Sequence, residues 1–271
     1  MDEVYGERIP TDRLRRSLHC LWFYAGDPGL DPQRIAPDGR CELILHLGSP
    51  YEALQPDGGW SRQGEALFVG QLTRPLTLRA PGRIDLVAAR FRPAAARAFT
   101  RRPLERFTNR AAPLSELVAP HEITALVAEL RGAERGARPG LLEKWLAPRL
   151  ADGGDDAVER CVEAIYDSEG RIGMAALQHL SGLPARTLQR RFAVEVGAPP
   201  RLLASVVRFR RVFEALEAPQ VRNWTDAAQA AGYFDHPQMT RDFRRFLGCT
   251  PSAFLASRRG LAANLVDLAH S

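Results

Sequence analysis

Two stretches of this chain repeat one pattern, and the repeat predicts the fold of the C-terminal third. Residues 176–200 read ALQHLSGLPARTLQRRFAVEVGAPP, and residues 227–251 read AAQAAGYFDHPQMTRDFRRFLGCTP. The copies lie fifty-one positions apart and align without a gap. Each holds a short helix rich in small residues, a turn, and a second helix that ends at Gly, with Pro three residues later. This is the outline of a helix-turn-helix, present twice.

The second helix of each copy has an apolar stripe and an opposite polar face. Three apolar residues in each copy fall within about 80° of one another on a helical wheel, so we expect them to be buried. The stripe residues are Leu188, Phe192 and Val196 in the first copy, and Met239, Phe243 and Leu247 in the second. Asp235 is expected to cap the second of these helices at its N-terminus.

The polar face of each second helix carries side chains that are suited to reading bases in the major groove. Arg can donate two parallel hydrogen bonds to guanine, and Gln can pair in the same way with adenine. A lone Arg on a helix is more often a solvated surface residue, but both copies place Arg at the same outward position, Arg190 and Arg241. The candidate base-contact residues are Arg186, Gln189, Arg190, His236, Gln238 and Arg241.

Two further features fit a DNA-reading domain. Phosphate contacts add affinity without sequence information, and the candidate phosphate-contact residues are Thr187, Arg191, Arg244 and Arg245. Between the copies, Pro199 to Leu216 has apolar residues at helical spacing and is predicted to form one long helix. Such a connector would hold the two reading helices at a fixed distance, as contacts with major-groove faces about 34 Å apart require.

The basic charge of the chain is concentrated in the duplicated segment. Residues 171–259 carry 14 basic and 6 acidic side chains, a net of +8, whereas residues 1–170 carry a net of −2. Nearly every basic residue is Arg, and Lys144 is the one Lys. A surface that binds a polyanion requires such a concentration of positive charge. A solvated, Arg-rich surface without a binding role has the same composition.

The first 150 residues change from strand to helix character along the chain. Short apolar runs separated by turn residues extend from about residue 18 to 92 and predict a small barrel or sandwich. From Ala94 the periodicity becomes helical. We therefore predict an α+β protein with a small β-barrel and trailing helices in residues 1–150, and an all-α tandem helix-turn-helix domain in residues 155–260. Ala151–Asp156 is the expected linker, with Asp155 or Asp156 capping the next helix.

The helical motifs resemble the AraC/XylS family of transcription regulators. The stretch Leu183–Phe192, followed by 197–200, is similar to the first helix-turn-helix of the family. Ala227–Tyr233 with Met239–Phe254 is similar to its second, signature motif. The resemblance covers roughly residues 155–258 and implies seven helices, with base contacts at the six positions named above. Pro237 departs from the family pattern, which often has Ser or Gln there, so base reading by the second helix would be narrower.

The N-terminal half also resembles part of a known class of proteins. Residues 37–48, PDGRCELILHLG, together with Phe91-Arg92-Pro93, resemble a cupin-like sensor domain found on a subset of these regulators. Such domains bind effectors or dimerise. A barrel of this size can hold a small ligand in its mouth. The candidate effector-pocket residues are Trp22, Tyr24, Glu42, His46 and Tyr51.

Two hypotheses for this domain remain open. Glu42 and His46 would share one face of a strand with only apolar neighbours, and burying both without partners is costly, which favours a small-molecule site. Alternatively, the aromatic residues simply fill the core and the domain only dimerises.

The sequence has no pattern typical of an enzyme. A metal-dependent cupin enzyme needs a cluster of His and Glu ligands, but His46 stands alone in its strand. A DNA-repair methyltransferase needs four zinc-bound thiolates, and residues 1–150 hold only Cys20 and Cys41. A nucleoid-type binder without sequence preference is a third alternative, which a measured specificity ratio would test. We expect no catalytic residues, no cofactor and no metal site.

The expected partners follow from these motifs. They are double-stranded DNA and a small-molecule effector, with RNA polymerase and a second copy of the chain as further candidates. The four Cys residues are widely spaced, as in reduced cytoplasmic proteins. No run approaches about 18 apolar residues, and the N-terminus lacks an apolar signal segment, so we expect a cytoplasmic protein without membrane contact.

Overall fold

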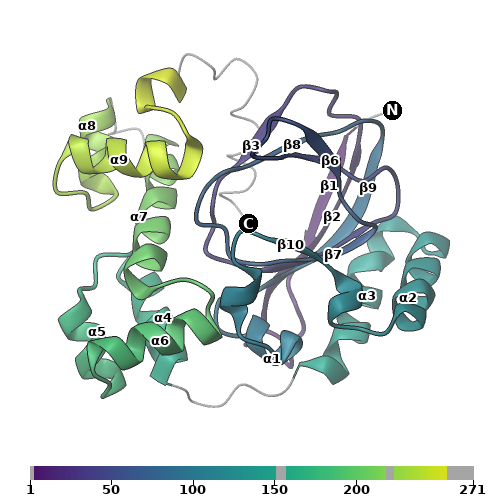
Figure 1. Cartoon of the computed structure of the whole chain (residues 1–271), viewed down its shortest axis with the longest axis horizontal. Helices are drawn as coiled ribbons and strands as arrows, with labels where there is room; N and C mark the ends of the chain where they lie inside the picture. The colour runs from purple at the N-terminus through teal and green to yellow at the C-terminus, as the bar shows by residue number, and fades with distance from the viewer. Residues whose placement is uncertain (1–2, 151–156, 218–222, 255–271) are drawn as a thin grey trace.

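A computed structural model describes residues 3–150, 157–217 and 223–254 of the chain (Figure 1). The N-terminal half is rich in strands and carries helices at one side, and the part that follows residue 157 is helical. The predicted α+β class is therefore confirmed. The predicted linker Ala151–Asp156, with its capping Asp, lies outside the described residues.

The described strands form two antiparallel sheets. The larger sheet has the strand order β1-β2-β9-β4-β7-β10, and the smaller one has the order β3-β8-β5-β6. The bounds in the larger sheet are β1 Val4–Arg8, β2 Leu18–Gly26, β9 Ile84–Phe91, β4 Glu42–His46, β7 Ala66–Val69 and β10 Ala111–Pro113. Those in the smaller sheet are β3 Gln33–Ile35, β8 Leu76–Arg79, β5 Glu52–Leu54 and β6 Trp60–Arg62. The strands expected over residues 18–92 are confirmed, but they form two sheets and not one closed barrel.

The two faces of the larger sheet pack against different parts of the domain, because successive side chains of a strand point to opposite faces. On β4, Leu43 and Leu45 belong to the main hydrophobic core of the domain. Ile44 points to the other face, where it packs with Leu86 and Ala88 of β9. One face therefore supports the fold, and the opposite face is turned toward the smaller sheet.

Helices cover the core face of the larger sheet. Helix α2 (Pro120–Gly132) buries Ile123, Leu126, Val127 and Leu130, which recur at the helical spacing expected after Ala94. Helix α3 (Arg138–Leu146) packs onto β2 and β9. The short helix α1 (Ala96–Thr100) adds Phe99, whose ring lies 6.0 Å from that of Phe68.

The described part of the C-terminal domain contains six helices and the start of another. They are α4 Ala157–Asp167, α5 Met174–Ser181, α6 Ala185–Glu195, α7 Pro200–Glu217, α8 Trp224–Ala230 and α9 His236–Leu247. Residues 251–254 are helical up to the limit of the described chain. Helix pairs α5–α6 and α8–α9 are the two predicted helix-turn-helix units, and α7 is the predicted connector.

Helix α7 belongs to two hydrophobic cores at once. Leu203 and Val207 pack in the first core, with the stripe of α6. Val206, Phe209 and other residues of α7 pack in the second core, with the stripe of α9. The helix has 18 residues, which corresponds to a length of about 27 Å. Because each helix-turn-helix unit packs against its own set of α7 residues, α7 fixes the distance between the two units.

The two halves of the chain are in direct contact. The Thr108 hydroxyl donates a hydrogen bond of 2.6 Å to the carbonyl oxygen of Gly197, at the end of the first helix-turn-helix. A guanidinium nitrogen of Arg34 donates one of 3.0 Å to the carbonyl oxygen of Leu247, at the end of the second. Both helix-turn-helix units are therefore held by the β-rich domain.

The aromatic core of the second unit predicts that replacing two Phe residues of the same domain by Ala changes the free energy of unfolding by very different amounts. Phe243 is fully buried, and its ring lies 5.1 Å from that of Phe209 and 5.2 Å from that of Trp224. Phe243→Ala should lower the free energy of unfolding by about 3–5 kcal/mol, because it leaves a cavity. Phe234→Ala, at a residue that is 95% exposed, should change it by less than about 0.5 kcal/mol. Urea denaturation of both variants measures the difference, and equal losses would contradict this description of the core.

Candidate functional site

The first reading helix presents the predicted polar face to solvent. Leu188, Phe192 and Val196 are completely buried, which confirms the predicted stripe. The three candidate base-contact residues of α6 are exposed: Arg186, Gln189 and Arg190. The helix begins directly after Pro184, which stands at the N-cap position. These side chains can reach a ligand without any change in the packing of the helix.

The second reading helix, α9, begins with a well-formed cap. Asp235 accepts a hydrogen bond of 2.6 Å from the backbone N–H of Gln238, which confirms the predicted N-cap. The side-chain oxygen of Gln238 in turn accepts one of 3.2 Å from the backbone N–H of Phe234. The amide oxygen has a second lone pair and the amide nitrogen has two N–H donors, so Gln238 can keep this bond and still contact a base. His236 and Arg241 are exposed, and both remain candidate base contacts.

The four candidate phosphate contacts differ in their surroundings. Arg191 forms an ion pair of 2.8 Å with Glu195 on the same helix, so its charge is already partnered. Thr187 is half-buried. Arg244 and Arg245 are exposed at the end of α9, and the Arg245 guanidinium lies 5.5 Å from the ring centre of Phe246. Of the four candidates, Arg244 and Arg245 are therefore the most accessible to a phosphate.

A cavity of about 410 Å³ lies between the two sheets. Its walls come from β2, β4 and β9 of the larger sheet, from β3 and β8 of the smaller sheet, and from α7. All five candidate effector-pocket residues line it: Trp22, Tyr24, Glu42, His46 and Tyr51. Helix α7 adds Phe209, Arg210 and Phe213 to the wall, which the sequence did not indicate.

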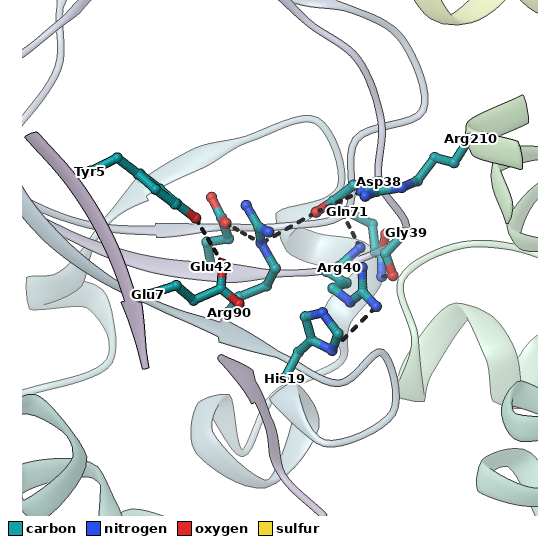
Figure 2. A network of polar contacts seen from close by, with 10 residues as sticks. All are labelled: Tyr5, Glu7, His19, Asp38, Gly39, Arg40, Glu42, Gln71, Arg90 and Arg210. Atoms are coloured by element: carbon teal, nitrogen blue, oxygen red, sulfur yellow. Dashed lines mark hydrogen bonds and ion pairs between the residues drawn. The ribbon is translucent and has the colours of Figure 1, made fainter. Parts of the chain in front are cut away.

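The polar end of this cavity is built around Arg90 of β9 (Figure 2). The Arg90 side chain is only 3% exposed, and its Nε lies 2.7 Å from a carboxylate oxygen of Glu42 and 3.5 Å from one of Asp38. Burial by itself lowers the pKa of Arg90, but the charges of Glu42 and Asp38 outweigh burial and raise it. The expectation that Glu42 has only apolar neighbours is therefore wrong, because Arg90 pairs with it across the strands.

Asp38 connects this network to the C-terminal domain. Its carboxylate also lies 3.9 Å from a guanidinium nitrogen of Arg210 on α7. Burial lowers the pKa of Arg210, and Asp38 opposes that effect. One carboxylate therefore lies between a cation of the sheet and a cation of the helix that joins the two helix-turn-helix units.

The loop that carries Asp38 fits closely against the helices. Gly39 has a φ of +81°, and a Cβ added there would lie 2.9 Å from both Leu203 and the Tyr166 hydroxyl. The side chain of Gln71 donates a hydrogen bond of 2.6 Å to the Gly39 carbonyl oxygen. Only Gly allows this conformation and this approach at once. The loop thereby holds Asp38 in place against α7.

His46 lies in the same cavity wall, away from the Arg90 network. Its Nδ1 lies 3.0 Å from the carbonyl oxygen of Gly64. Burial lowers the pKa of His46, so the ring is neutral near pH 7. A carbonyl oxygen only accepts hydrogen bonds, so Nδ1 carries the proton and Nε2 is an acceptor. Nε2 has no hydrogen-bond partner among the described residues.

Comparisons with known proteins agree with this geometry. A family model described as "Helix-turn-helix domain" matches residues 179–257, and one described as "Domain of unknown function (DUF6597)" matches residues 7–113. The C-terminal part of the chain is an AraC-type helix-turn-helix domain. The chain is thus a DNA-binding transcription regulator, as the duplicated motif predicts.

Solved structures that match the chain include several of ToxT from Vibrio cholerae. An apo variant of ToxT is 9% identical with a TM-score of 0.48, and the match covers 94% of this chain and 97% of that one. ToxT from strain O395 is 10% identical with a TM-score of 0.47 over 87% and 96% of the two chains. ToxT with an unsaturated fatty acid bound is 10% identical with a TM-score of 0.47 over 88% and 95%. No curated protein matches the chain.

The described residues contain neither a cluster of metal ligands nor a membrane-spanning helix. No group of three or more His, Cys, Asp or Glu side chains lies together in a way that could hold a metal ion. The helices of that part of the chain include none that is long and apolar enough to cross a membrane.

Sequence reasoning missed the residues that join the cavity to the AraC-type domain. Arg90 stands in the apolar run IDLVAARF of β9, and an Arg in such a strand requires a partner. That signal was present in the sequence. Its partners, Glu42 and Asp38, are distant along the chain, as is Arg210, which faces Asp38 from α7, and no local pattern indicates these contacts.

Two Arg variants of the AraC-type domain should separate base reading from phosphate binding. Arg190→Ala should weaken binding to a selected site by about 1–3 kcal/mol and relax preference at one or two base pairs. Arg245→Ala should weaken binding to all sequences and lower the salt slope by about one. Fluorescence anisotropy on a duplex selected from a random library and on a random duplex, over a series of salt concentrations, measures both effects. Equal losses on both duplexes for both variants would remove the distinction.

Proposed function

We propose that a small molecule in the cavity between the sheets controls how this transcription regulator binds DNA. The observation that carries the proposal is that α7 belongs both to the cavity wall, through Phe209 and Phe213, and to a helix-turn-helix core. A molecule in the cavity would therefore contact the element that fixes the two reading helices.

The cavity has the properties of a ligand site. A volume of about 410 Å³ lies within the usual range for small-molecule pockets, which combine apolar walls with a few polar groups. Here the walls include Ile44, Leu78 and Leu86, and the polar groups include Arg90 and His46. We propose Trp22, Tyr24, Glu42, His46 and Tyr51 as effector contacts.

Asp38 provides a route from the ligand to the DNA-binding domain. It faces Arg90 in the sheet and Arg210 in α7, at 3.5 Å and 3.9 Å. A ligand that accepts a hydrogen bond from Arg90 would compete for that cation, and the balance of charge on Asp38 would then shift toward Arg210. Such a change needs no large movement, because α7 is already in contact with both sites.

The remaining assignments belong to the same proposal. Residues 1–150 act as the sensor or dimerisation unit, and residues 155–260 act as the DNA-binding unit. Bases are contacted by the six candidates on α6 and α9, of which five are exposed and Gln238 is half-buried, and phosphates by Thr187, Arg191, Arg244 and Arg245. RNA polymerase and a second copy of the chain are the proposed protein partners. The protein has no catalytic role, needs no cofactor and acts in the cytoplasm.

A cavity-filling variant tests the ligand site. We expect a compound from a metabolite library to raise the melting temperature of the full chain and to change its affinity for a selected duplex. Ile44→Trp places a large side chain in the cavity and should abolish both effects. Leu54→Trp, at an exposed residue of β5 outside the cavity lining, is the matched control and should retain them. If no compound shifts the melting temperature while the chain dimerises, the domain is an oligomerisation module only.

A second variant tests the route through Asp38. Asp38→Asn keeps the shape of the side chain but removes the charge between Arg90 and Arg210. We expect the compound to bind this variant still, as thermal shift would show, while the change in DNA affinity on ligand binding becomes smaller. An undiminished DNA response in Asp38→Asn would mean that the coupling runs elsewhere.

A further inference from the structure

Phe234 is an exposed aromatic residue in the turn between the two helices of the second helix-turn-helix. Its side chain is 95% exposed, well above the other exposed large apolar residues of the described chain, of which Ile9 reaches 72%. It stands one position before Asp235, the N-cap of the reading helix α9. An apolar residue at this position commonly packs back on the first turns of the helix. Phe234 does not pack in this way.

The repeat provides an internal comparison for this position. Fifty-one residues earlier, Leu183 stands one position before Pro184, the N-cap of α6. Leu183 is half-buried and packs against the core of the first unit. The same place in the two copies thus holds an apolar residue that supports the fold in one and extends into solvent in the other.

The backbone around Phe234 is held in a defined position. Its N–H donates to the side-chain oxygen of Gln238 at 3.2 Å. The preceding residue, Tyr233, is buried, and its hydroxyl donates a hydrogen bond of 3.0 Å to Asp242. With anchored residues on both sides, the exposed ring is presented from a fixed point at the N-terminus of α9.

We propose that Phe234 is a specificity-determining residue that contacts the methyl group of a thymine in the major groove. In helix-turn-helix proteins the N-terminal end of the second helix approaches the base edges. The thymine C5 methyl is the apolar feature of the major groove, and Phe is among the side chains that contact it. The exposed residues that follow, His236 and Arg241, are polar and suited to the hydrogen-bonding edges. Phe234 thus adds a large aromatic side chain to a face whose other exposed apolar residue at the start of α9 is the small Pro237.

Replacing thymine by deoxyuridine tests this contact, because it removes the methyl group and leaves base pairing intact. The probe is a duplex selected by the full chain from a random library, with each thymine replaced in turn and affinity measured at one fixed salt concentration. For the unchanged protein we expect one or two positions at which the replacement weakens binding about four-fold, as the loss of one buried methyl group predicts. Phe234→Ala should weaken binding to the thymine duplex at least as much and should no longer respond to the replacement at those positions.

Two control variants make the result interpretable. Phe234→Leu keeps an apolar side chain and should retain part of the response to the thymine methyl. Leu30→Ala removes another exposed apolar residue, 65% exposed and in the β-rich domain, and should leave DNA binding unchanged. Unaltered melting temperatures show that each variant is folded.

Two outcomes would overturn the proposal. Phe234→Ala could respond to deoxyuridine in the same way as the unchanged protein, in which case another residue contacts the methyl group. Alternatively, Phe234→Ala could leave DNA affinity unchanged while transcription with purified RNA polymerase falls, in which case the exposed ring faces a protein partner.

Discussion

The packing of α7 is the constraint on which the rest of the structure depends. Its buried residues are divided between two cores, with Leu203 and Val207 in one and Val206 and Phe209 in the other. Neither helix-turn-helix can move relative to the other without loss of one of these sets of contacts. The distance between the reading helices therefore follows from a single helix of 18 residues. In the proposed function, this fixed distance lets the two reading helices bind DNA as one geometrically matched pair.

The same helix is in contact with the sensor half of the molecule. Phe213 and Arg210 lie in the cavity wall, and the loop around Gly39 packs against Leu203. The polar link through Asp38 is largely withdrawn from water, which strengthens each charge interaction and makes an unbalanced charge costly. A change in the charges at the cavity end of the network would therefore alter the electrostatic energy of Arg210 on α7. Coupling of this kind needs only two arrangements of one packed element that differ slightly in energy.

Features that depend on local periodicity could be predicted from the sequence. The stripe Leu188, Phe192 and Val196 repeats at helical spacing, and both its burial and the exposure of Arg190 follow from that spacing alone. The alternation along β4 likewise indicated that Glu42 and His46 share one face, and both line the cavity.

Features that depend on tertiary contacts could not be predicted in this way. The division of the strands into two sheets depends on which strands pair, and a strand pattern does not contain that information. The partners of Arg90 are Glu42 on β4 and Asp38 in the preceding loop, and Asp38 in turn faces Arg210 of α7. The repeat predicted equivalent helices but gave no indication that Phe234 is exposed where Leu183 is packed, because that difference arises from how each turn meets its own core.

We propose that a ligand in the cavity and DNA on the reading helices are linked by one coupling free energy, which must then be reciprocal. The measurement is the affinity of the full chain for a cavity ligand, by calorimetry, with and without a saturating selected duplex, beside its affinity for the duplex with and without saturating ligand. If the two sites are coupled, both affinities change by the same factor, as linkage requires. A ligand affinity that is identical in the presence and absence of DNA would contradict the account.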